Sequence, residues 1–184
     1  GKEEKARNDA EKYRSHNTRM VNSSSNGYCI QWPSETVAQI KTGEIVGIKE
    51  VHSQNWSVAV IRWVSRNESN QTQIGLKVLS LTALPFGTRV IQRVGADHEY
   101  MRTLLLPEDP STQQPLTLLT SRVPFRSDQK VMLTQHGKRR LIRLGKKLND
   151  SGAYNLFEVE RLIKPSNGNE ETQSSEFESL WGKL

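Results

Sequence analysis

The sequence of 184 residues has almost no cysteine and no long apolar run, and each absence excludes a class of protein. The single cysteine, Cys29, allows neither a disulfide within the chain nor a cysteine-based zinc cluster. No stretch approaches the roughly 20 apolar residues of a membrane-spanning helix, so no membrane span is predicted. A reducing compartment suits such a chain, and we therefore expect a cytoplasmic protein.

The signatures of common enzymes and of metal sites are missing as well. The sequence contains no G-x-S-x-G, no Walker loop and no G-x-G-x-x-G. Its four histidines lie far apart, with no acid or cysteine at ligand spacing, so no metal and no cofactor are expected. Cys29 stands between Tyr28 and Ile30, which is typical of a small buried residue. The sequence therefore favours a binding protein over an enzyme.

The net charge of +6 is distributed unevenly along the chain. Residues 86–165 carry fourteen bases and eight acids, whereas residues 166–184 carry one base and four acids. Six of the bases fall within residues 138–147, KRRLIRLGKK, interleaved with leucine and isoleucine. A solvated strand face is the simplest interpretation, and a surface for nucleic acid or an acidic partner is the alternative. Aromatic residues that would stack on bases are scarce around it, so nucleic acid is the less favoured partner.

Short apolar stretches separated by turn residues predict an all-β protein. Strands are expected at residues 18–21, 27–32, 43–51, 56–64, 72–81, 88–94, 100–106, 116–122, 130–135, 139–145 and 153–162. Pro85 and Gly87 indicate a domain boundary. We therefore predict two small barrels in tandem, the first over residues 14–85 and the second over residues 86–164.

Period-two alternation within one of these stretches, WSVAVIRWV at residues 56–64, assigns its side chains to two faces. A regular strand places Trp63 on the same face as Ala59 and Ile61, and Val64 on the opposite face.

Both ends of the chain are expected to be helical. Residues 1–13 are rich in helix formers, and residues 165–175 form a polar linker. Beyond the linker, one helical face is formed by Phe177, Leu180, Trp181 and Leu184, at positions i, i+3, i+4 and i+7. This helix is expected either to pack on the chain's own barrel or to bind a groove on a protein partner.

The loop NSSSNG, residues 22–27, joins the first two expected strands. It has the form N-x-S-x-x-G, with Asn22, Ser24 and Gly27 at the fixed positions, and the strand GYCIQW follows it. Downstream come GEIVGIKE and then WSVAVIRWV with IGLKVLSL, whose glycine is Gly75. In this order, the segments resemble the PilZ domain, whose second signature is [D/N]-x-S-x-x-G, over roughly residues 18–85.

The resemblance implies a six-stranded antiparallel barrel that binds the bacterial second messenger cyclic di-GMP. In the PilZ family the serine motif holds a guanine, and an upstream R-x-x-x-R motif clamps the phosphates. Here no R-x-x-x-R precedes the loop, and two arginines five residues apart are the candidates for the phosphates. The implied ligand contacts are Asn22, Ser24, Gly27, Arg14 and Arg19.

The function that the resemblance implies is a non-enzymatic receptor that couples cyclic di-GMP binding to an unidentified protein partner. Two other functions stay open. The same fold could act as an interaction module without nucleotide, in which case the loop is only a hydrogen-bonded turn between strands. The third hypothesis is a basic nucleic-acid-binding β-domain.

Overall fold

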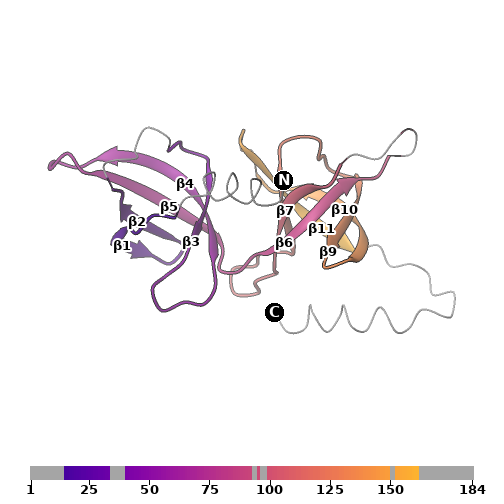
Figure 1. Cartoon of the computed structure of the whole chain (residues 1–184), viewed down its shortest axis with the longest axis horizontal. Coiled ribbons are helices and arrows are strands. Elements are labelled where there is room, and N and C mark those ends of the chain that lie inside the picture. The colour runs from indigo at the N-terminus through magenta and orange to yellow at the C-terminus, as the bar shows by residue number, and fades with distance from the viewer. Residues whose placement is uncertain (1–14, 34–39, 93–94, 96–98, 150–151, 162–184) are drawn as a thin grey trace, which may run out of the picture. The chain divides into compact units, whose positions relative to one another are not determined.

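The computed structural model describes residues 15–33, 40–92, 95, 99–149 and 152–161. The expected helices at 1–13 and near residue 180 lie outside these ranges. So do five residues with predicted roles: Arg14, Phe177, Leu180, Trp181 and Leu184. The described ranges contain eleven strands, and no helix long and apolar enough to cross a membrane occurs among them. The predicted all-β fold is confirmed, and the chain divides into two compact units between Leu79 and Ser80 (Figure 1).

The first unit is an antiparallel sheet built from five strands. They are β1 (Arg19–Ser24), β2 (Gly27–Gln31), β3 (Ile45–Ile48), β4 (Ser57–Arg66) and β5 (Thr72–Ser80). Their order across the sheet is β1-β2-β5-β4-β3, so β2 and β5, which are distant in the sequence, are neighbours. The described residues of this part of the chain supply five strands arranged as a sheet, where the sequence predicted a six-stranded barrel.

One buried cluster of the first unit lies on one face of this sheet, and Cys29, Val58 and Val60 are buried on the other face. Ala59 and Ile61 on β4 form this cluster with Ile74 and Leu76 on β5. Val64 packs against the same cluster, although alternation had placed it on the opposite face. The prediction for the C-terminal half of β4 was therefore wrong, because the side chains of β4 do not keep strict alternation between Ile61 and Val64.

The second unit is a closed six-stranded barrel, as predicted. Its strands are β6 (Leu84–Val90), β7 (Met101–Leu106), β8 (Thr117–Ser121), β9 (Lys130–Gln135), β10 (Lys138–Lys147) and β11 (Tyr154–Arg161). Around the barrel they follow the order β10-β11-β8-β7-β6-β9, and every pairing is antiparallel. Closure pairs every strand on both sides and leaves no exposed sheet edge.

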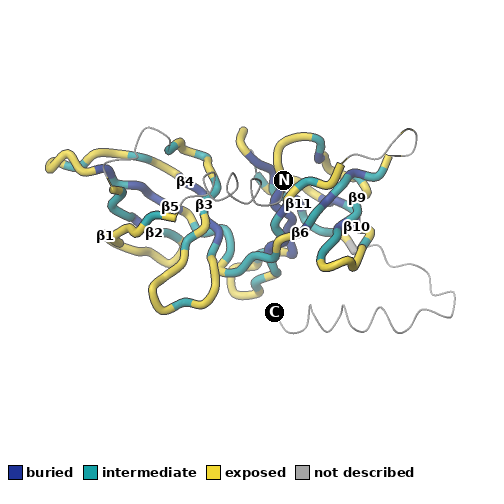
Figure 2. Tube along the Cα trace, in the orientation of Figure 1, coloured by how far each residue is buried: buried dark blue, intermediate teal, exposed yellow. Residues whose placement is uncertain are grey.

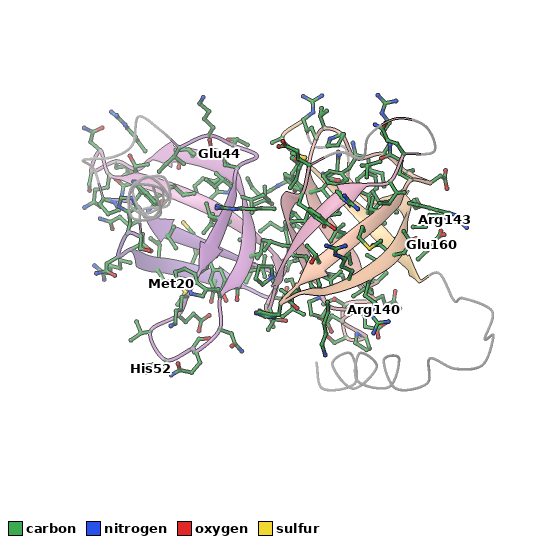
Figure 3. The ribbon with its side chains drawn as sticks, turned by 45° about the vertical axis from the view of Figure 1, so that its right-hand side comes forward. Met20, Glu44, His52, Arg140, Arg143 and Glu160 are labelled. Carbon is green, nitrogen blue, oxygen red and sulfur yellow. The ribbon has the colours of Figure 1, made fainter. Side chains whose placement is uncertain are left out.

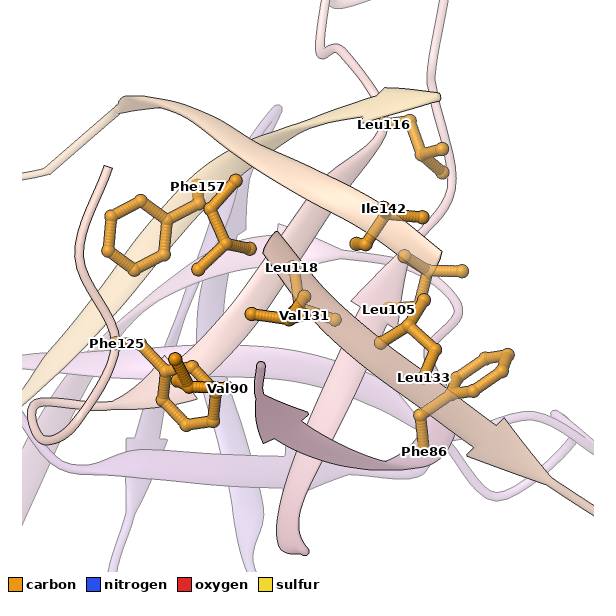
Figure 4. Packing of buried hydrophobic residues seen from close by; sticks show 11 residues of the cluster. Phe86, Val90, Leu105, Leu116, Leu118, Phe125, Val131, Leu133, Ile142 and Phe157 are labelled. Carbon is orange, nitrogen blue, oxygen red and sulfur yellow. The ribbon is translucent and has the colours of Figure 1, made fainter. Parts of the chain in front are cut away.

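The barrel interior is filled by aliphatic and aromatic side chains from all six strands and from the loop before β9 (Figure 4). The buried cluster consists of Phe86, Val90, Leu105, Leu116, Leu118, Phe125, Val131, Leu133, Ile142, Leu144 and Phe157. Two buried threonine hydroxyls, those of Thr88 and Thr103, satisfy each other at 2.6 Å. Alternate residues of each strand fill this core, so the intervening side chains form the outer face of the barrel.

Pro85 and Gly87, which the sequence suggested as boundary residues, lie inside β6. Proline is tolerated there because the ladder between β6 and β9 begins only at Gly87, which is in register with Thr134. The Pro85 carbonyl accepts a hydrogen bond of 2.9 Å from the Gln135 side chain. Pro85 and Gly87 therefore belong to a strand, and the boundary between the two compact units lies before this strand in the sequence.

Candidate functional site

The N-x-S-x-x-G loop is the tip of the hairpin that joins β1 and β2. Only Ser25 and Asn26 separate the two strands, and Ser24 lies in register with Gly27. Asn22 lies in register with Cys29, so Asn22 and Ser24 project from the same face of the sheet. Both are exposed, as is all of β1, which is an end strand of the sheet (Figure 2).

A bulge in β1 brings an arginine to the same face. Arg19 and Asn22 are three residues apart, and a regular strand would direct them to opposite faces. The ladder skips one residue, Val21, because Met20 pairs with Ile30 and the next pair joins Asn22 to Cys29. Arg19 pairs with Gln31, which shares the face of Cys29, and it is exposed. Three of the predicted ligand contacts therefore gather on one face of the hairpin.

Gly27 is required by the close approach of β5. A Cβ atom at this position would lie 2.5 Å from the carbonyl oxygen of Leu76. Next to it, the amide of Val78 donates a hydrogen bond of 2.9 Å to the carbonyl of Asn26. The glycine thus lets the hairpin tip lie against β5, and its φ angle is not positive.

The polar groups of the hairpin face are little used within the protein. The Ser24 hydroxyl lies 3.5 Å from the carbonyl oxygen of Gly27, which is long for a hydrogen bond of this kind. Asn22 makes no side-chain hydrogen bond in the part of the chain that the structure describes. A hydrogen-bonded turn alone therefore does not account for these side chains.

Beside Asn22, the same face has a floor of small residues with an indole on it. Cys29 is in register with Asn22 on one side and with Gly75 of β5 on the other. The indole of Trp63 covers Gly75 so closely that a methyl group there would overlap it. Trp63 is nonetheless 43% exposed. Asn22, Cys29, Gly75 and Trp63 thus form a row across β1, β2, β5 and β4, which we call the hairpin row.

The opposite face of the hairpin is occupied by the protein itself. Tyr28 pairs with Ser23, so both lie on the side of the core. The Tyr28 hydroxyl donates a hydrogen bond of 2.8 Å to Glu50 Oε1. This hydrogen bond, together with partial burial and the negative charge of Glu50, raises the pKa of Tyr28. A ligand of the hairpin is therefore expected on the face of Asn22 and Ser24.

Trp63 is the residue of this face that sequence reasoning missed. Regular alternation assigned it to the core face with Ile61, and only the contact with Gly75 reveals its position. The signal available in the sequence was the pairing of one tryptophan with one glycine on neighbouring strands. No group of three histidine, cysteine, aspartate or glutamate side chains that could hold a metal occurs among the described residues.

The basic stretch 138–147 forms β10 of the second unit. Ile142 and Leu144 point into the barrel and are buried, whereas Arg139 and Leu141 lie on the exposed outer face. The predicted alternation holds for Ile142 and Leu144, which are buried, but not for Leu141, which is exposed, or for Arg140, a base that alternates with the outer residues.

Two family models match the chain in tandem. Residues 1–85 match "Cyclic-di-GMP receptor FimW, middle PilZ domain", and residues 86–162 match "FimW C-terminal beta-barrel domain". The chain is also 32% identical over 185 residues to the cyclic-di-GMP receptor FimW of Pseudomonas aeruginosa. That alignment covers 95% of this chain and 30% of the length of the relative. No solved structure matches the chain.

Proposed function

The chain belongs to the FimW family of PilZ-domain proteins, and from this premise we propose that it is a receptor for cyclic di-GMP. The observation that carries the proposal is the gathering of Arg19, Asn22 and Ser24 on one exposed face of the hairpin. The FimW relative, which is named as a receptor for this nucleotide, supports the same ligand. The receptor acts without catalysis and in the cytoplasm, where the free thiol of Cys29 stays reduced.

The chemistry of these three side chains matches a guanine nucleotide. The amide of Asn22 and the hydroxyl of Ser24 each provide a donor and an acceptor for the edge of a guanine base. The guanidinium of Arg19 provides paired donors for phosphate oxygens. Arg14 is proposed as a second phosphate ligand on the strength of the sequence alone. Gly27 contributes by its lack of a side chain, because it lets the hairpin lie against β5.

Trp63 extends this face with an aromatic surface. Cys29 and Gly75 carry little or no side chain and are both buried, and the indole lies directly on Gly75. Asn22 and Trp63 are the exposed members of the row, so a purine that hydrogen-bonds to Asn22 can contact the exposed part of the indole. Base–aromatic stacking contributes about 1–3 kcal/mol per base, which makes Trp63 a strong candidate contact.

The two neighbouring serines of the loop test the site assignment. A Ser24→Ala variant is expected to bind cyclic di-GMP about two- to tenfold more weakly, because it loses one hydrogen bond worth about 0.5–1.5 kcal/mol. A Ser23→Ala variant is the matched control and should bind like the parent chain, because Ser23 pairs with Tyr28 and faces away. Titration calorimetry measures both. Equal binding by the Ser24 variant and the parent would refute the site, and no heat with the parent chain would refute the function.

The exposed tryptophans provide a second matched pair. Trp63→Leu is expected to weaken cyclic di-GMP binding by about tenfold through loss of stacking. Trp56→Leu should have no effect, because Trp56 lies over Gly47 of β3, at the other end of the sheet. Trp56 is 53% exposed, close to the 43% of Trp63, so the two substitutions should remove similar amounts of packing. Calorimetry again measures the affinity, and equal losses in both variants would contradict a role for Trp63 at the site.

A further inference from the structure

The outer face of the second barrel carries a row of partly apolar side chains. Arg89 on β6 is in register with Met132 on β9, and Met132 is in register with Leu141 on β10. Residues paired in this way project to the same side. The Arg89 guanidinium lies 5.0 Å from the ring centre of Tyr100, which extends the row. Tyr100 and Leu141 are each 39% exposed, so the row is open to a partner.

Basic side chains flank this row on both sides. On one side, Lys130 of β9 lies directly opposite Arg143 of β10. The Arg143 Nη1 atom lies 3.6 Å from Oε2 of Glu160, which is in register with Arg143 on β11 (Figure 3). On the other side of the row, Arg139 is exposed and in register with Thr134. We call this surface the basic outer face; its members are Tyr100, Lys130, Met132, Arg139, Leu141 and Arg143.

Repulsion between the positive charges of the basic outer face favours the binding of an acidic group there. Two like charges placed directly opposite each other on neighbouring strands destabilise the sheet. Glu160 compensates part of the charge of Lys130 and Arg143, and the charge of Arg139 adds to the excess on the other side of the row. A partner that combines carboxylates with large apolar side chains complements both parts of this surface.

A segment of the same chain has this composition. Residues 170–184, EETQSSEFESLWGKL, contain four acids and one base. The large apolar residues of this segment, Phe177, Leu180, Trp181 and Leu184, fall at helical spacing. Glu176 and Glu178 flank the first of them. The segment therefore offers an apolar stripe for the row and carboxylates for the bases beside it.

The chain leaves the barrel next to this surface. Arg161, the last residue of β11, pairs with Ile142, the neighbour of Leu141. Residues 162–175 separate it from Glu176, and a chain of this length spans about 20 Å on average. The three strands that carry the row extend over only about 10 Å. Such a tether raises the effective concentration of the segment to roughly the millimolar range.

We propose that residues 176–184 bind the basic outer face of the second barrel of the same chain. The apolar stripe of the segment covers Tyr100, Met132 and Leu141, and its glutamates lie beside the flanking bases. This contact gives the predicted partner-binding residues an intramolecular partner. It involves none of the side chains proposed to bind cyclic di-GMP, so either proposal can fail without the other.

Lys130 allows a direct chemical test in the full chain. A water-soluble carbodiimide joins a carboxylate to a neighbouring amine as an amide, with loss of water. Peptide mass spectrometry is expected to find Lys130 coupled to Glu176 or Glu178 at least about fivefold more often than the exposed lysines of the first unit, Lys41, Lys49 and Lys77. Higher salt should lower this yield, because the pairing charges are partly exposed.

Charge reversal and apolar substitutions complete the test. Arg139→Glu should reduce coupling at Lys130 by about fivefold, whereas Lys49→Glu, a charge reversal on the first unit, should leave it unaltered. Leu180→Ser with Trp181→Ser should reduce it as well, which purely electrostatic attraction would not produce. Equal coupling to all lysines, or coupling only between differently isotope-labelled chains, would overturn the proposal. The proposal would also be overturned if Lys130 showed no coupling to the glutamates and an oligonucleotide bound to the basic outer face instead.

Discussion

Replacing Arg19 with alanine is expected to weaken cyclic di-GMP binding by about ten- to 150-fold. This loss of affinity corresponds to one charge-assisted hydrogen bond to a phosphate, worth about 1.5–3 kcal/mol. Arg19 is exposed on an end strand and belongs to no buried cluster, so the variant should fold normally. Calorimetric titration of the folded variant measures the loss, and its salt dependence should be smaller than that of the parent chain.

The bulge in β1 provides a sharper form of the same experiment. In a regular strand, residue 20 would share a face with Asn22, so an arginine there could replace Arg19. In this protein Met20 pairs with Ile30, on the core side of the hairpin. Arg19→Ala combined with Met20→Arg should therefore bind as weakly as Arg19→Ala alone. Recovery of parental affinity in the double variant would show that the assignment of faces is wrong.

Gly27→Ala is expected to destabilise the first unit by about 3 kcal/mol and to abolish cyclic di-GMP binding with it. The added methyl group would lie 2.5 Å from the carbonyl oxygen of Leu76, which is backbone and cannot rotate away. Overpacking of this kind costs roughly 1–3 kcal/mol, and more where the obstacle is rigid. The hairpin would have to separate from β5, which would also break the 2.9 Å hydrogen bond between Val78 and Asn26.

Urea denaturation measures this loss, because Trp32, Trp56 and Trp63 all lie in the first unit and report its unfolding by fluorescence. Gly152→Ala is the control for an added methyl group that meets no atom within 4 Å, and because it lies in the second unit, the unfolding of that unit is followed by far-UV circular dichroism. The free energy of unfolding of the control should stay within about 0.5 kcal/mol of the parent. If Gly27→Ala kept the parental free energy of unfolding but did not bind cyclic di-GMP, the glycine would be in direct contact with the ligand instead.

Much of the fold could be predicted from the sequence because strand formation depends on local pattern. The alternation of apolar and polar residues and the turn residues between them predicted a strand overlapping each of the eleven, although the one expected at 88–94 is displaced by four residues from β6. The resemblance to the PilZ domain, which the family model for residues 1–85 confirms, followed from the same local order of segments. Closure is a property of the whole sheet, and it is seen for the second unit, whereas the described residues of the first unit form a five-stranded sheet.

The faces of the strands could be predicted only where the alternation is regular. On β10 it is regular from Ile142 to Leu144, and these two predicted core residues are buried. On β4 it fails after Ile61, and Trp63 reaches the face of Gly75 instead of the core. A change of this kind depends on neighbouring strands that are distant in the sequence, so the local pattern does not reveal it.

By itself, the sequence determined the chemistry of the hairpin: an asparagine, a serine and a glycine at fixed spacing, with arginines upstream. Tertiary structure decided which of these residues can act together. The bulge at Val21 turns Arg19 to the face of Asn22, and the Leu76 carbonyl explains why residue 27 must be glycine. The physical reason is that residue spacing fixes the direction of a side chain only within a regular strand. Register shifts and the approach of a distant strand are set by packing between segments that the chain brings together only when it folds.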